Sequence, residues 1–135
     1  MKRDMELVKN ILIFYEDQDW PFNDEVIIEG YDENTIQFHL ELLVEAELLY
    51  CYVPPLKHPD LIKDKLGAQL TWNRPPIAKP TRMTWEGYEF IANAKNDTIW
   101  SQVMKVAGGF SVSVISQCLT AMAIFYAQTH GVIPR

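Results

Sequence analysis

The chain has 135 residues, of which 48% are hydrophobic and 22% are charged, and its formal net charge is −6. This balance is typical of a folded soluble domain and excludes a disordered tail, a disulfide scaffold and a broadly basic nucleic-acid coat. The two cysteines, Cys51 and Cys118, match no metal-binding spacing, so we expect reduced thiols in the cytoplasm. The opening residues lack the pattern of a secretory signal.

The charges are unevenly placed along the chain. Residues 1–47 hold 13 acids and three bases, whereas residues 48–105 hold five acids and eight bases. Residues 106–134 contain no Asp, Glu, Lys or Arg. Such a polarised distribution predicts separate surfaces that serve separate purposes.

The first part of the chain predicts a helix followed by a brief strand. Apolar residues recur at helical spacing over residues 4–16, and Asp4 is a suitable N-cap. The helix should stop before the polar stretch at residues 17–21. Residues 26–28 are a β-branched run between acids and predict a short strand.

A second helix then leads into two strands around a long loop. It covers residues 32–48, begins at Asp32 or Asn34, and carries its apolar residues on one face. Residues 49–53 and 81–83 predict strands, and the segment between them is rich in proline.

The C-terminal part predicts two more helices. Thr84 caps a third helix that runs to about residue 106 and is ended by two glycines, and a last helix covers about residues 111–128. The inward positions of the third helix are expected to be Trp85, Tyr88, Ile91, Ala92, Ala94 and Ile99.

This order predicts an α+β, mostly helical fold, namely a winged helix-turn-helix with an added C-terminal apolar helix. The winged-helix domain would cover residues 1–106, with its wing at about residues 49–84. The C-terminal helix, residues 110–128, would pack on that domain or form a dimer seam. Together they would make a single domain.

Three stretches of the sequence resemble a known family. They are MKRDMEL at residues 1–7, HLELLVEAEL at residues 39–48, and MTWEGYEF at residues 83–90 followed by NDTIW at residues 96–100. Together they resemble the bacterial and prophage domain-of-unknown-function family 2513, and the resemblance covers nearly the whole chain. It implies a winged-helix-like bacterial or phage protein of about this length, and it implies no catalytic residues.

One position departs from the usual pattern of winged helices. Related proteins read Ala-Gly-Leu at the end of the second helix, whereas this chain has Ala46, Glu47 and Leu48. Glutamate lacks the conformational freedom of glycine, so we expect a less sharp C-cap.

Binding to nucleic acid requires cations, because phosphate neutralisation supplies most non-specific affinity. The helix at residues 32–48 contains four glutamates and no Lys or Arg, although Asn34, Gln37 and His39 could contact base edges. The wing is the better candidate, since it gathers basic residues among tryptophans. The predicted nucleic-acid-binding residues are Lys57, Lys63, Lys65, Arg74, Lys79 and Arg82, together with Gln37.

No motif for catalysis, a cofactor, a metal or a small-molecule substrate is recognisable. His39 and Glu41 lie on different sides of their helix, since residues two apart do not face each other. His58 has no second histidine near it in sequence. We therefore expect a protein that is not an enzyme.

The last helix is almost uncharged and apolar around most of its circumference. Its apolar run is close to the length needed to span a membrane but contains serine, threonine and glutamine, so insertion is not favoured. Packing across the first helix or a helix-mediated homodimer would cover it. The predicted dimer residues are Val114, Ile115, Leu119, Met122 and Phe125.

Two functions follow from these patterns. One is a DNA-associated, regulator-like winged helix that uses its basic wing. The other is an interaction module whose acidic face binds a basic protein partner.

Overall fold

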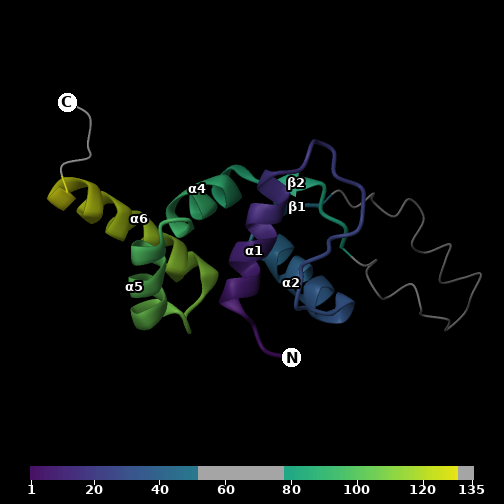
Figure 1. The fold of residues 1–135 in the computed structure, drawn as a ribbon, viewed down its shortest axis with the longest axis horizontal. Coiled ribbons are helices and arrows are strands. Elements are labelled where there is room, and N and C mark those ends of the chain that lie inside the picture. Colours follow the sequence, from purple (N-terminus) through teal and green to yellow (C-terminus); the bar gives the residue numbers. More distant parts are fainter. Residues whose placement is uncertain (52–77, 131–135) are drawn as a thin grey trace, which may run out of the picture.

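The structure, a computed structural model, describes residues 1–51 and 78–130 (Figure 1). This part of the chain is mostly helical and contains one small two-stranded sheet, so the predicted α+β, mostly helical class is confirmed. The elements are α1 (Met5–Glu16), α2 (Glu33–Glu45), β1 (Leu49–Tyr50), β2 (Arg82–Met83), α4 (Trp85–Ala94), α5 (Asp97–Ala107) and α6 (Val112–His130).

The starts of α1 and α2 follow the sequence prediction closely. The side chain of Asp4 accepts the backbone N–H groups of Glu6 and Leu7, and Asp32 accepts that of Thr35. Short carboxylate side chains satisfy the free N–H groups of a first helical turn from just outside the helix. The boundaries of α1 are therefore confirmed, and Asp32 is the residue that starts α2.

The end of α2 is sharper than the sequence suggests. Glu47 adopts the left-handed conformation, with φ of 61°. The Leu48 N–H donates to the Leu43 carbonyl at 2.9 Å, and the Glu47 N–H donates to that of Val44 at 3.0 Å. These two bonds are those of a Schellman motif, with Leu43 and Leu48 buried beside it. A glutamate thus occupies a position that normally favours glycine.

The predicted strand at residues 26–28 is wrong, because the described structure has no strand between α1 and α2. Val26 is buried, whereas Ile27 is 70% exposed. The β-branched run places Val26 in the core but pairs with no strand. The described strands β1 and β2 pair with each other. Nearby, the Phe22 N–H donates to the Thr81 carbonyl at 3.0 Å.

The two strands that flank the predicted wing pair with each other. They are antiparallel, with Leu49 opposite Met83 and Tyr50 opposite Arg82. Leu49 and Met83 face the core, and the other pair faces solvent. Most of the predicted wing, residues 52–77, lies outside the described residues.

The predicted third helix is in fact two helices. Asn96 ends the run because its side chain caps α5 by accepting the Ile99 N–H, a local bond that competes with continuation of α4. The inward face of α4 also differs from the prediction, and it consists of Gly87, Phe90, Ile91 and Ala94. Trp85, Tyr88 and Ala92 are exposed instead, with Trp85 at 76%.

Glycine at position 87 explains this register. A Cβ built there would lie 2.2 Å from the Leu48 carbonyl oxygen, so α4 approaches the backbone just before β1 through a residue without a side chain. Thr84 tightens the same junction, because its hydroxyl donates to the Glu47 carbonyl and accepts the Gly87 N–H. Gly87 must therefore face inward, and Trp85 and Tyr88 face out.

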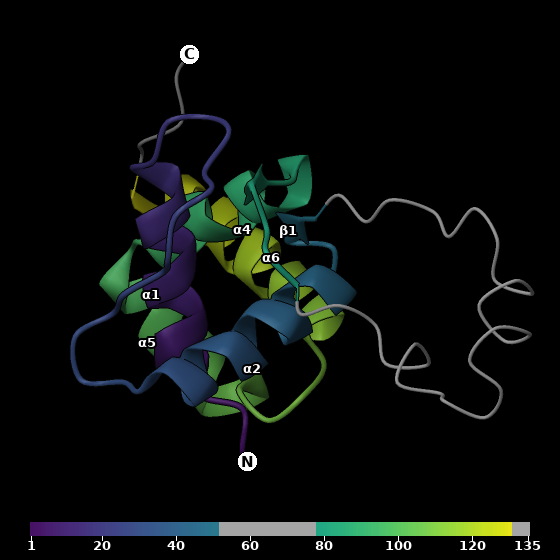
Figure 2. The same cartoon turned by 90° about the vertical axis from the view of Figure 1, so that its right-hand side faces the viewer.

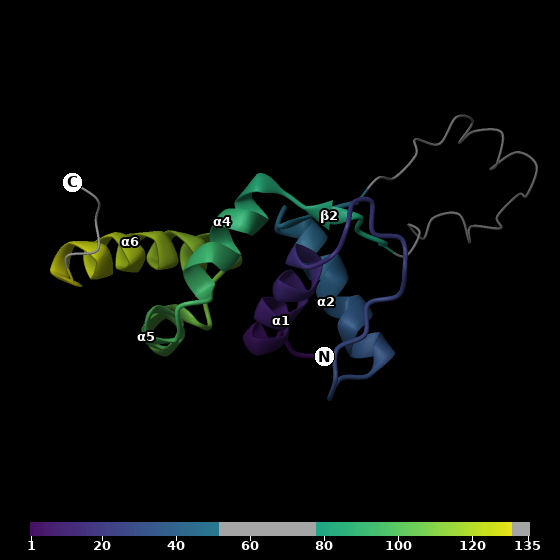
Figure 3. The same cartoon turned by 45° about the horizontal axis from the view of Figure 1, so that its top comes forward.

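The core lies where α1 packs against α2, the sheet and α4, and the C-terminal helices extend the domain from there (Figures 1 and 2). α6 packs mainly on α5 and also on α4. Its C-terminal half reaches well beyond α1 and α2 (Figure 3). The C-terminal half of the uncharged helix therefore lies away from α2 (Figure 3).

Candidate functional site

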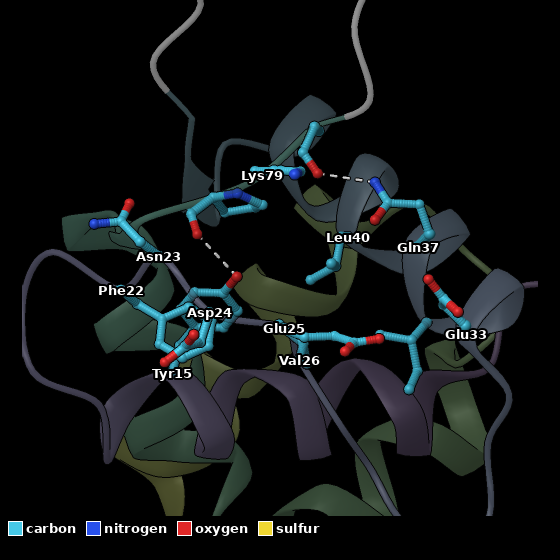
Figure 4. Close-up of a pocket in the computed structure, with 13 residues that line it drawn as sticks. Tyr15, Phe22, Asn23, Asp24, Glu25, Val26, Glu33, Gln37, Leu40 and Lys79 are labelled. Atoms are coloured by element: carbon cyan, nitrogen blue, oxygen red, sulfur yellow. Dashed lines mark hydrogen bonds between the residues drawn. The ribbon is translucent and has the colours of Figure 1, made fainter.

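A groove of about 430 Å³ lies at the foot of the predicted wing (Figure 4). It is bounded by α1, the segment at residues 22–26, the first half of α2 and the chain entering β2. We call it the wing-foot groove. Its lining residues are Tyr15, Phe22, Asn23, Asp24, Glu25, Val26, Glu33, Ile36, Gln37, Leu40, Ala78, Lys79 and Pro80.

Two side chains hold the wall formed by residues 78–80. The Tyr15 hydroxyl donates to the Pro80 carbonyl at 2.9 Å, and the Gln37 amide donates to the Ala78 carbonyl at 2.8 Å (Figure 4). One anchor comes from α1 and the other from α2. The groove is therefore a built feature, although its residues are far apart in sequence.

The floor of the groove is aromatic and apolar. The rings of Tyr15 and Phe22 meet edge to face at 5.3 Å, and Val26, Ile36 and Leu40 are buried beside them. Burial raises the pKa of Tyr15 well above its usual range, and the nearby Cys51 thiol adds to the effect. The Tyr15 phenol therefore remains a neutral hydrogen-bond donor at physiological pH.

The rim of the groove is acidic. Asp24, Glu25 and Glu33 are exposed, and none of them forms a salt bridge with any residue that the structure describes. Lys79 is the one cation among the lining residues. An acidic rim over an apolar floor suits a ligand that combines positive charge with an apolar side chain.

The outward face of α2 continues this negative surface. Glu33, Gln37, Glu41 and Glu45 recur every four residues and so share one side of the helix. The three glutamates are exposed, and the helix contains no Lys or Arg. We call this set the acidic ridge. Such a ridge repels a phosphate backbone and attracts a basic surface.

His39 lies inside the protein and cannot reach a base edge, contrary to the sequence prediction. It is fully buried. Its Nε2 accepts the Asp4 N–H at 2.8 Å, and its Nδ1 lies 2.8 Å from the Thr35 carbonyl. A backbone N–H can only donate and a carbonyl can only accept, so the ring is neutral with its proton on Nδ1. His39 ties the start of α1 to α2.

Of the predicted basic residues, two lie in the described structure, near the foot of the predicted wing. Arg82 is exposed, and its guanidinium lies 4.5 Å from the centre of the Tyr50 ring. Lys79 is exposed on the rim of the groove, beside Gln37. The other predicted basic residues, Lys57, Lys63, Lys65 and Arg74, lie outside the described residues.

The residues predicted for a dimer seam divide into two groups. Ile115 and Leu119 are completely buried within the chain, and Met122 is partly buried against the core. Val114 and Phe125 are exposed, at 38% and 58%. The first group attaches α6 to its own domain, and only the second is free to contact another surface.

The charge count of residues 1–47 predicts an acidic surface such as the rim and the ridge, but no sequence pattern predicts the wing-foot groove. Its floor joins residues of α1, the 22–26 segment and α2, and no sequence motif links these positions. The apolar residues Phe22 and Val26 beside acids were a weak signal.

Comparison with known proteins places the chain in a family. Residues 2–113 match the model of the family described as "Hypothetical protein (DUF2513)". The chain therefore belongs to this family, as its three sequence stretches predict. The match ends at the beginning of α6, so most of that helix lies beyond it.

A relative from Haemophilus influenzae (strain ATCC 51907 / DSM 11121 / KW20 / Rd), titled "Uncharacterized protein", is 27% identical over 105 residues. The aligned region covers 76% of this chain and 75% of that protein. No solved structure matches the chain.

Proposed function

We propose that the chain is a winged-helix binding module that recognises a basic protein partner through the acidic ridge and the wing-foot groove. The order α1, α2, β1 and β2, with a long connection between two paired strands, supports the winged-helix assignment. In that fold α2 would occupy the position of the recognition helix. Its charge then suits a cationic protein surface better than DNA.

The observation that carries this proposal is the unpaired charge of the acidic ridge. Glu33, Glu41 and Glu45 stand on one side of α2 without a salt bridge to any described residue. Complementary charge steers association and selects partners more than it adds final affinity. We therefore expect a partner with clustered Lys and Arg side chains and rapid, salt-sensitive binding.

The test measures binding of Lys- and Arg-rich peptides containing one aromatic residue, by stopped-flow fluorescence at low and physiological salt. A Glu33→Gln/Glu41→Gln/Glu45→Gln variant should associate about 10-fold more slowly. The matched control is Glu29→Gln/Glu86→Gln/Glu89→Gln, which removes three exposed carboxylates elsewhere and has the same net charge. Equal slowing in both variants, or no binding of any basic peptide at low salt, would contradict the proposal.

A second candidate is contact between DNA and the wing. It is favoured by the exposed guanidinium of Arg82 over Tyr50 and by the exposed amine of Lys79, which flank the entrance to a segment rich in basic residues. Cations beside an aromatic ring can hold a phosphate backbone. This role would make the protein a cytoplasmic, regulator-like DNA-associated module that does not use α2 for reading.

Duplex binding measured across a salt titration tests the second candidate. Arg82→Glu should weaken binding and reduce the slope of log affinity against log salt by about 1. Lys105→Glu is the control, because Lys105 is exposed on α5, which lies away from the two strands (Figure 1). Absence of binding to every duplex at low salt would rule out this role.

A further inference from the structure

We propose that two copies of the chain associate through the outward face of α6, with the two helices antiparallel. This inference concerns a different surface from the proposed partner site and does not depend on it. It rests on how α6 is attached, on the spacing of its exposed side chains and on its lack of charge.

α6 is attached to the domain along one side, where Val112, Met122 and Tyr126 are also partly buried against the core. Among its described side chains only Ile115 and Leu119 are buried, and both lie in its first half. The opposite side remains exposed, with Ile124 at 53% and Phe125 at 58%. The second half of the helix also projects beyond the rest of the domain (Figures 1 and 3). A projecting helix of this kind leaves large apolar side chains in water.

The exposed side of α6 has the spacing of a helix–helix contact. Val114, Ala121 and Gln128 are seven residues apart, and Gln117 and Ile124 are another pair at the same interval. These five exposed residues form one seam at alternating intervals of three and four, which is the pattern of paired helices. Ala121 lies at its centre, where a small side chain allows two helices to approach closely. We call these residues the α6 seam.

The absence of charge indicates a second copy as the occupant. In a two-fold interface each surface meets itself, so any charged patch meets its own sign. The chain carries a net charge of −6, yet residues 106–134 contain no Asp, Glu, Lys or Arg. The α6 seam can therefore meet its own copy without repulsion. Antiparallel pairing also keeps the two acidic domains apart, because the second half of each helix projects beyond its own domain (Figures 1 and 3).

A lipid bilayer suits the same surface less well. Val112–Thr129 is the one helical span in the described residues that is long and apolar enough to cross a membrane, with a mean hydropathy of 1.2. Its 18 residues extend about 27 Å, slightly less than a bilayer core of about 30 Å. Gln117 and Gln128 would have to enter hydrocarbon, which disfavours that placement.

Sedimentation of the full chain at micromolar concentration tests the proposal. The wild-type chain should sediment at twice its 15.6 kDa mass, and Ile124→Glu should sediment as a monomer. Asn34→Glu is the matched control, because it adds the same charge at an exposed position on α2 and should remain dimeric. Circular dichroism should show unchanged helix content, since both positions are on the surface.

A second variant tests the antiparallel arrangement. Ala121→Cys should form a covalent dimer on mild oxidation, because Ala121 lies opposite itself when the seams pair about their centre. Ser101→Cys, exposed on α5, should form far less. A monomeric wild-type chain, equal masses for the Ile124→Glu and Asn34→Glu variants, or monomers recovered with phosphatidylcholine vesicles would overturn the proposal. Equal cross-linking at both cysteines would overturn the antiparallel arrangement.

Discussion

The helices α2 and α6 of this molecule are held in different ways. α2 is fixed at its start by Asp32, in its middle by buried His39 and at its end by the Schellman motif at Glu47. α6 is capped by Ser111 and held mainly by the buried side chains of Ile115 and Leu119. Both helices bury apolar side chains, but α2 is also fixed by directional polar bonds along its length.

The free surfaces of the two helices also differ, in their charge. The free face of α2 is acidic, and that of α6 is uncharged. A firmly placed acidic ridge can present fixed charges to a basic partner, because its geometry is set before binding. An uncharged projecting helix is stabilised most when another surface covers its exposed apolar side chains. Under the two proposed roles, the placement of charge would separate recognition of a partner from self-association within one small domain.

The largest expected effect comes from removing an anchor of α6. Leu119 is completely buried, so Leu119→Ala should destabilise the fold by about 2–5 kcal/mol. Phe125→Ala removes a larger side chain from the exposed face and should change stability by less than about 0.5 kcal/mol. Urea denaturation of both variants in the Ile124→Glu background measures this difference without a contribution from association. Similar losses for the two would show that α6 has no distinct attached face.

The next effect tests the junction between α2 and α4. Gly87→Ala places a Cβ 2.2 Å from the Leu48 carbonyl oxygen, and the backbone must move to accommodate it. We expect a loss of about 1–3 kcal/mol in the free energy of unfolding. Gly109→Ala is the control, since a Cβ there meets no atom within 4 Å and should be nearly neutral. Thermal unfolding that does not separate the two variants would contradict the close approach.

Local chemistry explains which parts of the fold could be predicted from sequence. The caps at Asp4 and Asp32 were predictable, because a side chain that accepts N–H groups two or three residues ahead acts within one turn. The face of α4 was not, because it depends on Gly87 meeting a carbonyl nearly 40 positions earlier in the chain. The isolated run at residues 26–28 has strand propensity but no strand to pair with.

The candidate site shows the same limit. The charge of the acidic ridge could be counted along the chain, since carboxylates on a helix face solvent by default. The role of His39 could not, because its partner Asp4 is 35 residues away and polar residues within an apolar stripe have no single interpretation. The wing-foot groove depends on bonds from Tyr15 and Gln37 to a distant backbone segment. Such long-range bonds leave no periodic pattern.

A smaller effect of opposite sign is expected where α2 ends. Glu47 holds φ of 61°, a conformation that costs a residue with a side chain about 1–2 kcal/mol, so Glu47→Gly should stabilise the fold by about 1 kcal/mol. Glu45→Gly is the control, because it removes the same charge from within the helix and should destabilise it by about 1 kcal/mol. Guanidinium denaturation distinguishes the two, and destabilisation by both would show that Glu47 is not strained.

The smallest effect concerns the caps and is confined to acid pH. Hydrogen bonding to Thr35 lowers the pKa of Asp32, so the folded state favours the carboxylate. The stability from this cap is complete above about pH 4 and is lost as pH falls through the lowered pKa. Ser111, which caps α6, does not titrate in this range. Hydrogen exchange should therefore show acid-induced fraying at Thr35 but not at Val114.

Asp32→Asn separates the charge of this cap from its hydrogen bond. Asparagine still accepts the Thr35 N–H, so the start of α2 should persist while its acid dependence disappears. Asp19→Asn is the control, because Asp19 is exposed and lies outside every described helix, and it should leave the pH profile of Thr35 unchanged. If hydrogen exchange at Thr35 still rises in acid in the Asp32→Asn variant, the fraying comes from protonation of the wider acidic surface. Neutralising that surface is the one remaining change that acts on α2 and spares α6.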